Sequence, residues 1–174
     1  MKTWKIISLA AALALVAGAA RAGDIGKPAR DFKITTLSGE TVRMADLKGK
    51  VIVVNRWATW CTPCKAEMVA FENYMRQHPD TDLKIYAVTV ELAVPKDKLK
   101  PLQGILHYPI ATGISGWFYK VMSGVPTSYV IDRQGVLRYA DAGAFTQDSF
   151  TKLVDPLLAE PAPDAAPTQQ VAAK

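Results

Sequence analysis

The stretch NRWATWCTPCKAEM, residues 55–68, contains Cys61 and Cys64, the only two cysteines of the 174-residue chain. Residues 51–57 are apolar and rich in β-branched side chains, which is typical of a strand buried on both faces of a parallel sheet. From residue 62 to 77, apolar side chains recur at spacings of three and four, which predicts an amphipathic helix. The two cysteines therefore lie where a buried strand leads into a helix.

The segments around this junction predict an α/β fold built on a central mixed β-sheet. Residues 83–90 read as a second buried strand, and strand–helix–strand order gives a βαβ unit whose strands run parallel. The further elements that we expect are a hairpin over 32–43, short helices over 96–102 and 115–122, an extended piece over 108–113, a hairpin over 127–140, and a last helix from about Thr146 that Pro156 should kink or end. Helices should cover both faces of the sheet.

The first 22 residues have the charge order and hydropathy of a secretory signal peptide. Lys2 and Lys5 precede an apolar run over residues 6–20, and Ala20-Arg21-Ala22 fits a small-residue cleavage site. The run is shorter than the roughly 20 apolar residues of a spanning helix. We therefore expect a cleaved signal and a periplasmic protein, with an uncleaved anchor in the inner membrane, facing the periplasm, as the alternative.

The rest of the chain reads as one domain followed by a tail. Residues 24–159 are enough to bury a stable hydrophobic core without the help of disulfides or metal ions. Residues 160–174 are rich in proline, alanine and polar side chains, and we expect them to be disordered. The formal net charge of +5 falls to +2 without the signal segment, which has three basic residues and no acidic one. No basic stripe indicates a nucleic-acid partner.

A bracing disulfide and a zinc site are two possible interpretations of the cysteine pair. In the chain-entropy model, a bridge closing so short a loop contributes roughly 2 kcal/mol, which a domain of this size does not need. For zinc, the pair and the two histidines, His78 and His107, would supply four ligands. His78, however, lies at the far end of the predicted helix, about 20 Å from Cys64 at 1.5 Å per residue. We therefore expect no metal.

A redox role fits the position of the pair best. Cys61 precedes the first helical turn, where free backbone N–H groups stabilise an anion and lower the pKa of a thiol. Pro63 suits that turn, because its missing N–H has no partner there. Cys64 shares a helix face with Met68 and Phe71 and should be buried. We expect an exposed Cys61 to attack disulfides and Cys64 to resolve the mixed disulfide.

Three segments resemble a known family. RWATWCTPCKAEM, residues 56–68, resembles the Trp-Cys-x-x-Cys site of the thioredoxin superfamily, and VPTSYVIDRQG, residues 125–135, resembles its cis-proline segment and the following hairpin. Residues 26–55 resemble the N-terminal extension of the TlpA-like periplasmic thiol–disulfide oxidoreductases, which include the cytochrome c maturation reductases. The resemblance covers nearly all of residues 24–158.

This resemblance implies a thioredoxin-like fold, a mixed sheet flanked by helices, with an N-terminal β-hairpin extension. It also implies that Cys61 is the nucleophile, that Cys64 resolves, and that the Val125–Pro126 bond is cis and packed against the disulfide. The Val125 backbone would then pair with an incoming peptide strand, and Trp60 would shield the site. The substrate-binding residues that we expect are Trp60, Thr62, Pro63, Val125 and Pro126.

One departure from the family concerns proton transfer. Where thioredoxin has a buried acid, this chain has Asn55, as many TlpA-like proteins do, and an amide cannot take the proton from Cys64. Such proteins often place a glutamate near the end of the next strand. Glu91 is our candidate for this role, although it comes one residue early, and a solvated strand-end glutamate is the alternative.

A second departure is Arg56, at a position where the family usually has an aromatic or aliphatic residue. A charged side chain in a central strand needs a partner. Asp132 and Glu67 are the candidates that the sequence offers.

Residues and resemblance together predict a secreted thiol–disulfide oxidoreductase that exchanges disulfides with proteins through a mixed disulfide on Cys61. The resemblance implies a reductant, kept reduced by a membrane thiol donor. Apocytochrome c, a copper-assembly protein and a pool of misfolded proteins all fit as substrates. No cofactor is implied, because the chain has no Gly-rich phosphate loop, and we expect a monomer.

Two other function classes stay open. The N-terminal region also resembles the peroxiredoxin-like branch, which suggests a peroxidase, but RWATWCTP lacks the Pro-x-x-x-Thr-x-x-Cys setting of a peroxidatic cysteine. A copper-handling protein is the other class, since two thiols can hold Cu(I). No methionine cluster or nearby histidine supports it.

Overall fold

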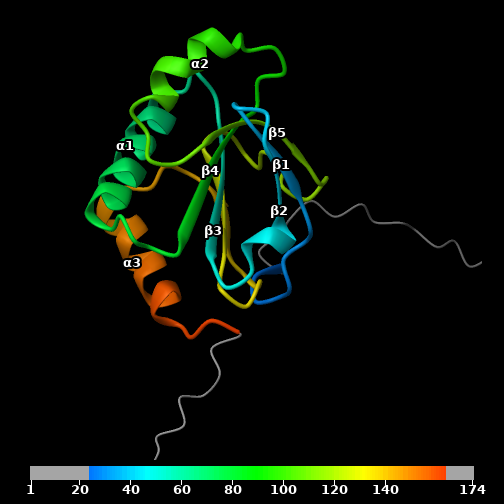
Figure 1. Cartoon of the computed structure of the whole chain (residues 1–174), viewed down its shortest axis with the longest axis vertical. Coiled ribbons are helices and arrows are strands. Elements are labelled where there is room, and N and C mark those ends of the chain that lie inside the picture. Colours follow the sequence, from blue (N-terminus) through cyan, green and yellow to red (C-terminus); the bar gives the residue numbers. More distant parts are fainter. Residues whose placement is uncertain (1–23, 164–174) are drawn as a thin grey trace, which may run out of the picture.

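The computed structural model describes residues 24–163 (Figure 1). The predicted signal segment, residues 1–22, and most of the predicted tail lie outside the described residues. Among the residues that are described, no helix combines the length and the apolar character needed to cross a membrane.

A seven-stranded mixed sheet forms the centre of the molecule, with strand order β2-β1-β5-β4-β3-β6-β7 (Figure 1). Strands β3, β4 and β5 run parallel to one another, and the remaining neighbours pair antiparallel. The strands are β1 (Lys33–Thr36), β2 (Thr41–Arg43), β3 (Val51–Trp57), β4 (Leu83–Thr89), β5 (Ile110–Ser115), β6 (Thr127–Ile131) and β7 (Leu137–Ala142). The predicted N-terminal hairpin, β1–β2, extends the sheet beyond β5, and the expected α/β class is confirmed.

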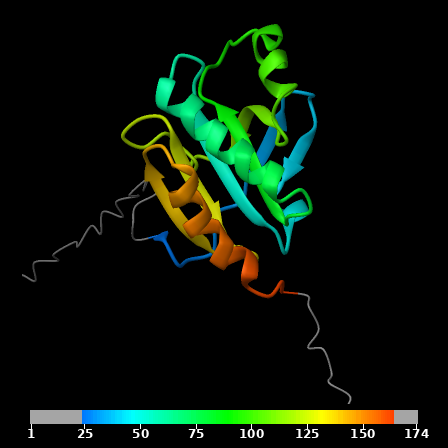
Figure 2. The same ribbon diagram turned by 90° about the vertical axis from the view of Figure 1, so that its left-hand side faces the viewer.

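Three α-helices accompany the sheet: α1 (Thr62–Gln77), α2 (Lys96–Gln103) and α3 (Gln147–Ala159). Figure 2 shows α1 and α3 side by side across one face of the sheet, and these two helices contact each other. The N-terminus of α3 is capped by Thr146, whose side chain accepts a hydrogen bond from the Ser149 N–H. The predicted bounds of β3 and α1 match the structure.

Two apolar cores lie on the two faces of the sheet, because side chains alternate along a strand. In β3, Val51, Val53 and Trp57 join the core under α1 and α3, whereas Ile52 and Val54 join the core on the opposite face. That opposite core is closed mainly by aromatic side chains: Phe32, Tyr86, Phe118, Tyr119 and Tyr129. β3 is thus buried on both faces, as its apolar run predicts.

The predicted helix over residues 115–122 is wrong, and so is the prediction of helices on both faces. Residues 116–122 form turns, and the opposite face carries only the one-turn 3-10 helix η2 (Met44–Leu47). Gly116 has φ = 115°, which breaks a right-handed helix. Phe118 and Tyr119 are both buried in the core on this face of the sheet, where they pack from the turns and not from a helix.

The C-terminal helix passes through Pro156 and ends only at Ala159, so the proline does not terminate it. Val154 and Leu157, on either side of Pro156, are buried against the core. Their burial outweighs the hydrogen bond that proline removes.

The first residues of the predicted tail contact the domain. The Arg138 guanidinium pairs with the Glu160 carboxylate at 2.9 Å, and the Gln134 side chain donates to the Pro161 carbonyl at 2.7 Å. Contacts with the β6–β7 hairpin therefore continue past the predicted boundary at residue 159.

Replacing Phe71 by Ala should lower the free energy of unfolding by about 3–5 kcal/mol, because Phe71 is fully buried among Tyr108, Phe145 and Phe150. Val69→Ala is the matched control: this residue is exposed on the same helix, and its change should stay within about 0.5 kcal/mol. Urea unfolding with the disulfide intact measures both, and equal losses would contradict the packing described.

Candidate functional site

The loop between β3 and α1 is fastened to the end of β4 by a carboxylate. Glu91 accepts hydrogen bonds from the Thr59 backbone N–H at 2.6 Å and from the Thr59 hydroxyl at 2.9 Å. Glu91 therefore lies beside the loop over residues 57–61. Both oxygens of Glu91 hold the segment that leads into Cys61.

The cysteine pair begins α1 and is oxidised. Cys61 is the N-cap residue, and its Sγ accepts a hydrogen bond from the Cys64 N–H at 3.2 Å. Cys61 and Cys64 are joined by a disulfide, and Pro63 occupies the first helical turn, as predicted. The Cys64 N–H of this turn points toward the Cys61 sulfur, and the N-terminal end of a helix favours negative charge.

The prediction that Cys61 is exposed is wrong for this disulfide state. The Cys61 residue is 3 % exposed and the Cys64 residue 0 %. The Cys61 Sγ is bonded to Cys64 and lies 3.6 Å from the Val125 carbonyl oxygen, and these neighbours cover most of its surface. Both residues are thus buried in the disulfide, and the order in which their thiols are accessible stays a prediction.

The segment facing the disulfide is the turn before β6. The Val125–Pro126 peptide bond is cis, as the resemblance implies, and Pro126 is buried. The Thr127 hydroxyl donates to the Gly124 carbonyl at 2.6 Å and accepts from the Met122 N–H at 3.2 Å. These two bonds hold the turn that presents Val125 to the sulfur.

Residues beside and between the two cysteines are exposed. Trp60 is 68 % exposed, so much of its side chain lies in solvent, and its shielding of the site stays a prediction. Thr62 and Pro63, between the cysteines, are also exposed. Tryptophan is enriched at protein–protein interfaces, so Trp60 is a candidate contact residue beside Cys61.

The structure adds Glu67, which the sequence analysis considered only as a partner for Arg56. Its carboxylate is fully buried under the site. It accepts hydrogen bonds from the Asn55 side-chain amide at 2.7 Å and from the Phe145 N–H at 3.1 Å. Asn55 also donates to the Ser128 hydroxyl at 2.9 Å. A buried polar network thus joins β3, α1, β6 and the loop before α3.

Burial raises the pKa of Glu67 to about 7, against the smaller opposing effect of its hydrogen bonds. Glu67 lies three residues after Cys64 on the same helix face, and helical side chains lean toward the N-terminus, which here is the direction of Cys64. Cys64, Glu67, Met68 and Phe71 are spaced three and four residues apart, which the sequence already shows. This spacing marked Glu67 as an acid on the core face of the helix.

Both predicted partners of Arg56 are wrong. Asp132 pairs with Arg138 at 2.8 Å and accepts the N–H groups of the β6–β7 turn. Glu67 lies on the α1 face of the sheet, while Arg56, the next residue after Asn55 in β3, points to the opposite face.

Within residues 24–163, no group of three or more histidine, cysteine, aspartate or glutamate side chains is arranged to hold a metal ion. The His78 ring lies 2.9 Å from the Tyr74 carbonyl oxygen, and His107 pairs with Glu72. Each histidine thus has a partner other than the cysteines.

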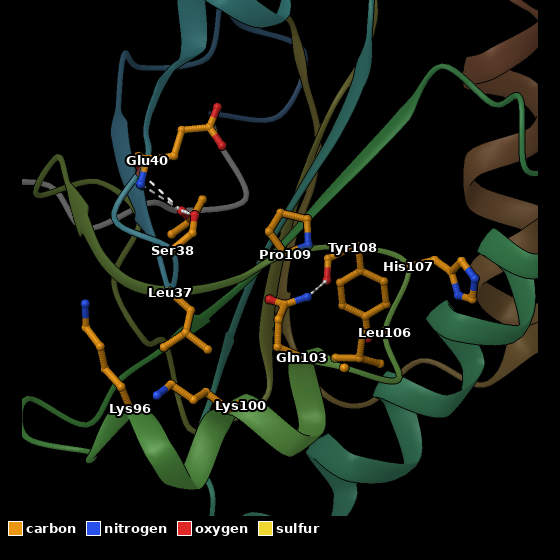
Figure 3. A pocket seen from close by; sticks show the side chains of 12 residues that line it. Leu37, Ser38, Glu40, Lys96, Lys100, Gln103, Leu106, His107, Tyr108 and Pro109 are labelled. Atoms are coloured by element: carbon orange, nitrogen blue, oxygen red, sulfur yellow. Dashed lines mark hydrogen bonds between the residues drawn. The ribbon is translucent and has the colours of Figure 1, made fainter.

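One hollow in the described part of the chain lies away from the thiol site. It measures about 660 Å³ and lies between the β1–β2 turn and α2, with Leu37 on one side and Lys96 and Lys100 on the other (Figure 3). Gln103 donates to the Tyr108 carbonyl at its floor. None of its lining residues touches the disulfide or belongs to the predicted site.

Comparison with known proteins places the chain in a family. Residues 25–140 match the model of the AhpC/TSA family. The chain belongs to the AhpC/TSA family. Within this family, Thioredoxin-like protein YneN of Bacillus subtilis (strain 168) is 34 % identical over 137 residues, covering 75 % of this chain and 78 % of that protein.

Further members and a solved structure agree with the thiol site. Thiol-disulfide oxidoreductase ResA of Bacillus thuringiensis subsp. konkukian (strain 97-27) is 32 % identical, covering 73 % of this chain and 75 % of that protein. The crystal structure of a thiol:disulfide interchange protein of the thioredoxin family from Chlorobium tepidum TLS has a TM-score of 0.63. It is 28 % identical in sequence, and the match covers 75 % of this chain and 95 % of that chain. This AhpC/TSA family member is therefore a thiol–disulfide oxidoreductase with a thioredoxin-like fold.

Replacing Glu67 by Gln should remove a pH dependence of stability. The carboxyl has an ordinary pKa of 4.5 and a folded pKa of about 7, so between these values only the folded state keeps the proton. Wild-type stability should fall relative to Glu67→Gln as the pH rises from 4.5 to 7, by roughly 3 kcal/mol in total, and level off above that. Urea unfolding of both proteins between pH 4 and 8 measures this, and a difference independent of pH would contradict it.

Proposed function

We propose that this oxidoreductase is secreted and reduces disulfide bonds of other proteins in the periplasm. The observation that carries the proposal is the Cys61 sulfur at the start of α1, 3.6 Å from the Val125 carbonyl and bonded to a fully buried Cys64. One sulfur lies next to a backbone edge on which a peptide strand can pair, and the other lies behind it.

The reaction runs in two thiol–disulfide exchanges. In the reduced protein, the Cys61 thiolate attacks one sulfur of the substrate disulfide, forming a mixed disulfide and releasing one substrate thiolate. The Cys64 thiolate then attacks the Cys61 sulfur, which restores the Cys61–Cys64 disulfide and releases the second substrate thiolate. Two electrons and the two thiol protons pass to the substrate, and a membrane thiol donor returns the pair to its reduced form.

The start of α1 supports Cys61 as the attacking group. Its thiolate would accept the Cys64 N–H and lie at the positive end of the helix dipole, and both effects lower a thiol pKa. Cys64 is buried, and burial in apolar surroundings raises a thiol pKa. Cys64 therefore needs a base before it can attack.

We assign this base to Glu67 ahead of Glu91. Glu67 is buried on the same helix face as Cys64, and its pKa of about 7 suits proton exchange near neutral pH. Both oxygens of Glu91 accept hydrogen bonds from Thr59, which suits a residue that positions the loop before Cys61. Proton transfer by Glu91 remains the alternative.

The secreted location and the reducing direction rest on other support. The first 22 residues have the pattern of a signal peptide, and the uncleaved anchor remains the alternative. The resemblance to the TlpA-like reductases supports reduction over oxidation. Disulfide-bonded proteins of that compartment, such as an apocytochrome c or a copper-assembly protein, fit as substrates.

The AhpC/TSA match favours a peroxidase as the second candidate. A peroxidatic cysteine needs a pocket that orients peroxide, whereas Cys61 lies beside a backbone carbonyl and bonds to a cysteine three residues away. Peroxide consumption by the reduced protein, followed alongside reduction of a protein disulfide, separates the two activities.

Changing Cys64 to Ser should arrest the reaction as a mixed disulfide on Cys61, because nothing then attacks the Cys61 sulfur. Expressed with its signal segment in a bacterial host, this variant should accumulate adducts that a thiol reductant releases and that mass spectrometry identifies. Cys61→Ser is the matched control, and it should accumulate none. Equal adducts in the two variants, or adducts in neither, would contradict the proposed roles.

Substitutions of Glu67 and of Glu91 should change the pH profile of the resolving step differently. In the wild type, release of substrate from the mixed disulfide should speed up as Glu67 ionises around pH 7. Glu67→Gln should slow this step by about 10²–10⁴-fold at pH 7 and move its rise toward the thiol range near pH 8.5. Glu91→Gln should keep the inflection, and loss of the inflection in Glu91→Gln alone would identify Glu91 as the base. Stopped-flow measurement of thiol release between pH 5 and 9 gives both profiles.

A further inference from the structure

Arg56 is a charged residue in the middle of the sheet. It is the sixth residue of β3 and pairs with Val88 of β4 on one side and Thr127 of β6 on the other. Because side chains alternate along β3, Arg56 shares the face of Ile52 and Val54 and points away from α1. Its neighbours on that face are apolar and aromatic.

The guanidinium of Arg56 lacks a counterion. Among the described residues, its Nε and Nη1 atoms are buried without a hydrogen-bond partner, and no carboxylate forms an ion pair with it. Burial lowers the pKa of Arg56, and the nearest titratable influence on it is the neutral phenol of Tyr129. A buried cation without a partner destabilises a fold, and an apolar residue in its place would not.

One end of this side chain is open. Arg56 is half-buried, and Nη2 is absent from the buried unpaired atoms although it has no hydrogen bond within residues 24–163. Nη2 therefore contacts solvent. A carboxylate that approaches it can accept a charge-assisted hydrogen bond from Nη2.

The open end lies close to where a substrate strand would bind. Thr127, the cross-strand partner of Arg56, is two residues from Val125, whose carbonyl lies 3.6 Å from the Cys61 sulfur. Two strand residues span about 7 Å, and neighbouring strands are about 5 Å apart. When a substrate peptide pairs beside Val125, the peptide residues that flank its cysteine therefore lie close to Arg56.

We propose that Arg56 binds a carboxylate of the substrate protein, carried by an acidic side chain within about four residues of the cysteine that Cys61 attacks. This inference rests on the proposed function and names a substrate feature for it. Arg56 is a positioning residue in this account, because it orients the substrate and does not touch the sulfur atoms. Its single solvent-facing nitrogen suits one carboxylate group.

The test uses disulfide-bonded peptides that differ only in having Glu or Gln at one position, scanned over four residues on each side of the cysteine. At one or more positions, the wild type should reduce the Glu peptide at least 10-fold more efficiently in kcat/KM. A charge-assisted hydrogen-bond pair of this kind supports that factor. In Arg56→Leu the Glu-to-Gln ratio should fall to within about 2-fold of one, and Arg56→Lys should give an intermediate ratio.

Two controls separate binding from other effects. Lys120 lies in the turn before β6, and its backbone carbonyl accepts a hydrogen bond from the Tyr129 hydroxyl. Lys120→Leu removes a positive charge there and should leave the Glu-to-Gln ratio unchanged. 2-Hydroxyethyl disulfide carries no charge, and wild type and Arg56→Leu should reduce it at equal rates. Arg56→Leu should unfold at the same or higher urea concentration than wild type, and Arg56→Met replaces it if Leu disturbs folding.

Each other result overturns the proposal in a distinguishable way. Suppose that the enzyme reduces 2-hydroxyethyl disulfide but shows no preference for Glu peptides, or shows a preference that persists in Arg56→Leu. Either result contradicts a role of Arg56 in substrate recognition and leaves the proposed function intact. A matching loss on 2-hydroxyethyl disulfide in Arg56→Leu means that Arg56 acts on the thiol. If wild type reduces none of these disulfides, the proposed function fails, and the carboxylate site fails with it.

Discussion

The hydrogen bond from the Cys64 N–H to the Cys61 sulfur is the contact on which the chemistry of this protein depends. It places one sulfur at the N-terminal end of α1, where backbone dipoles favour a thiolate, and it places the other one helical turn deeper, inside the core. Everything that fixes the start of α1 therefore also fixes the reactivity of the pair. β3 sets where the chain leaves the sheet, Glu91 ties the intervening loop to β4, and the turn before β6 supplies the facing carbonyl.

The two sides of the sheet serve different purposes at this site. On the α1 side, Asn55 and Glu67 form a buried polar network, in which burial raises the pKa of Glu67 to about 7. On the other side, Arg56 holds a positive charge that the described part of the protein does not neutralise. Asn55 and Arg56, neighbours in one strand, thus have different surroundings, because strand alternation sends consecutive side chains to opposite faces.

Much of this architecture could be predicted from local pattern. The bounds of β3 and α1 follow from a β-branched run and an amphipathic run, and Thr146 is recognisable as a helix cap. The turns over residues 116–122 could not be found in that way, since Phe118 and Tyr119 are set by packing against the sheet. The burial of Cys61, the network around Glu67 and the missing partner of Arg56 likewise depend on which distant residues meet. Sequence offers candidates for such contacts but does not choose among them.

Both ends of the described chain attach to one place. Near the N-terminus, the Gly26 N–H donates to the Leu137 carbonyl and the Ala29 N–H to the Gly135 carbonyl, while Glu160 and Pro161 bind the same β6–β7 hairpin. That hairpin turn lies beside the start of β3, at the opposite end of the strand from Trp57 and the disulfide. A tether that holds the molecule at either end of the described chain would consequently attach at the end of the sheet opposite the disulfide. The sulfur atoms would then face away from the tether. A membrane-bound form and a freely diffusing form would then offer the same reactive face to a client.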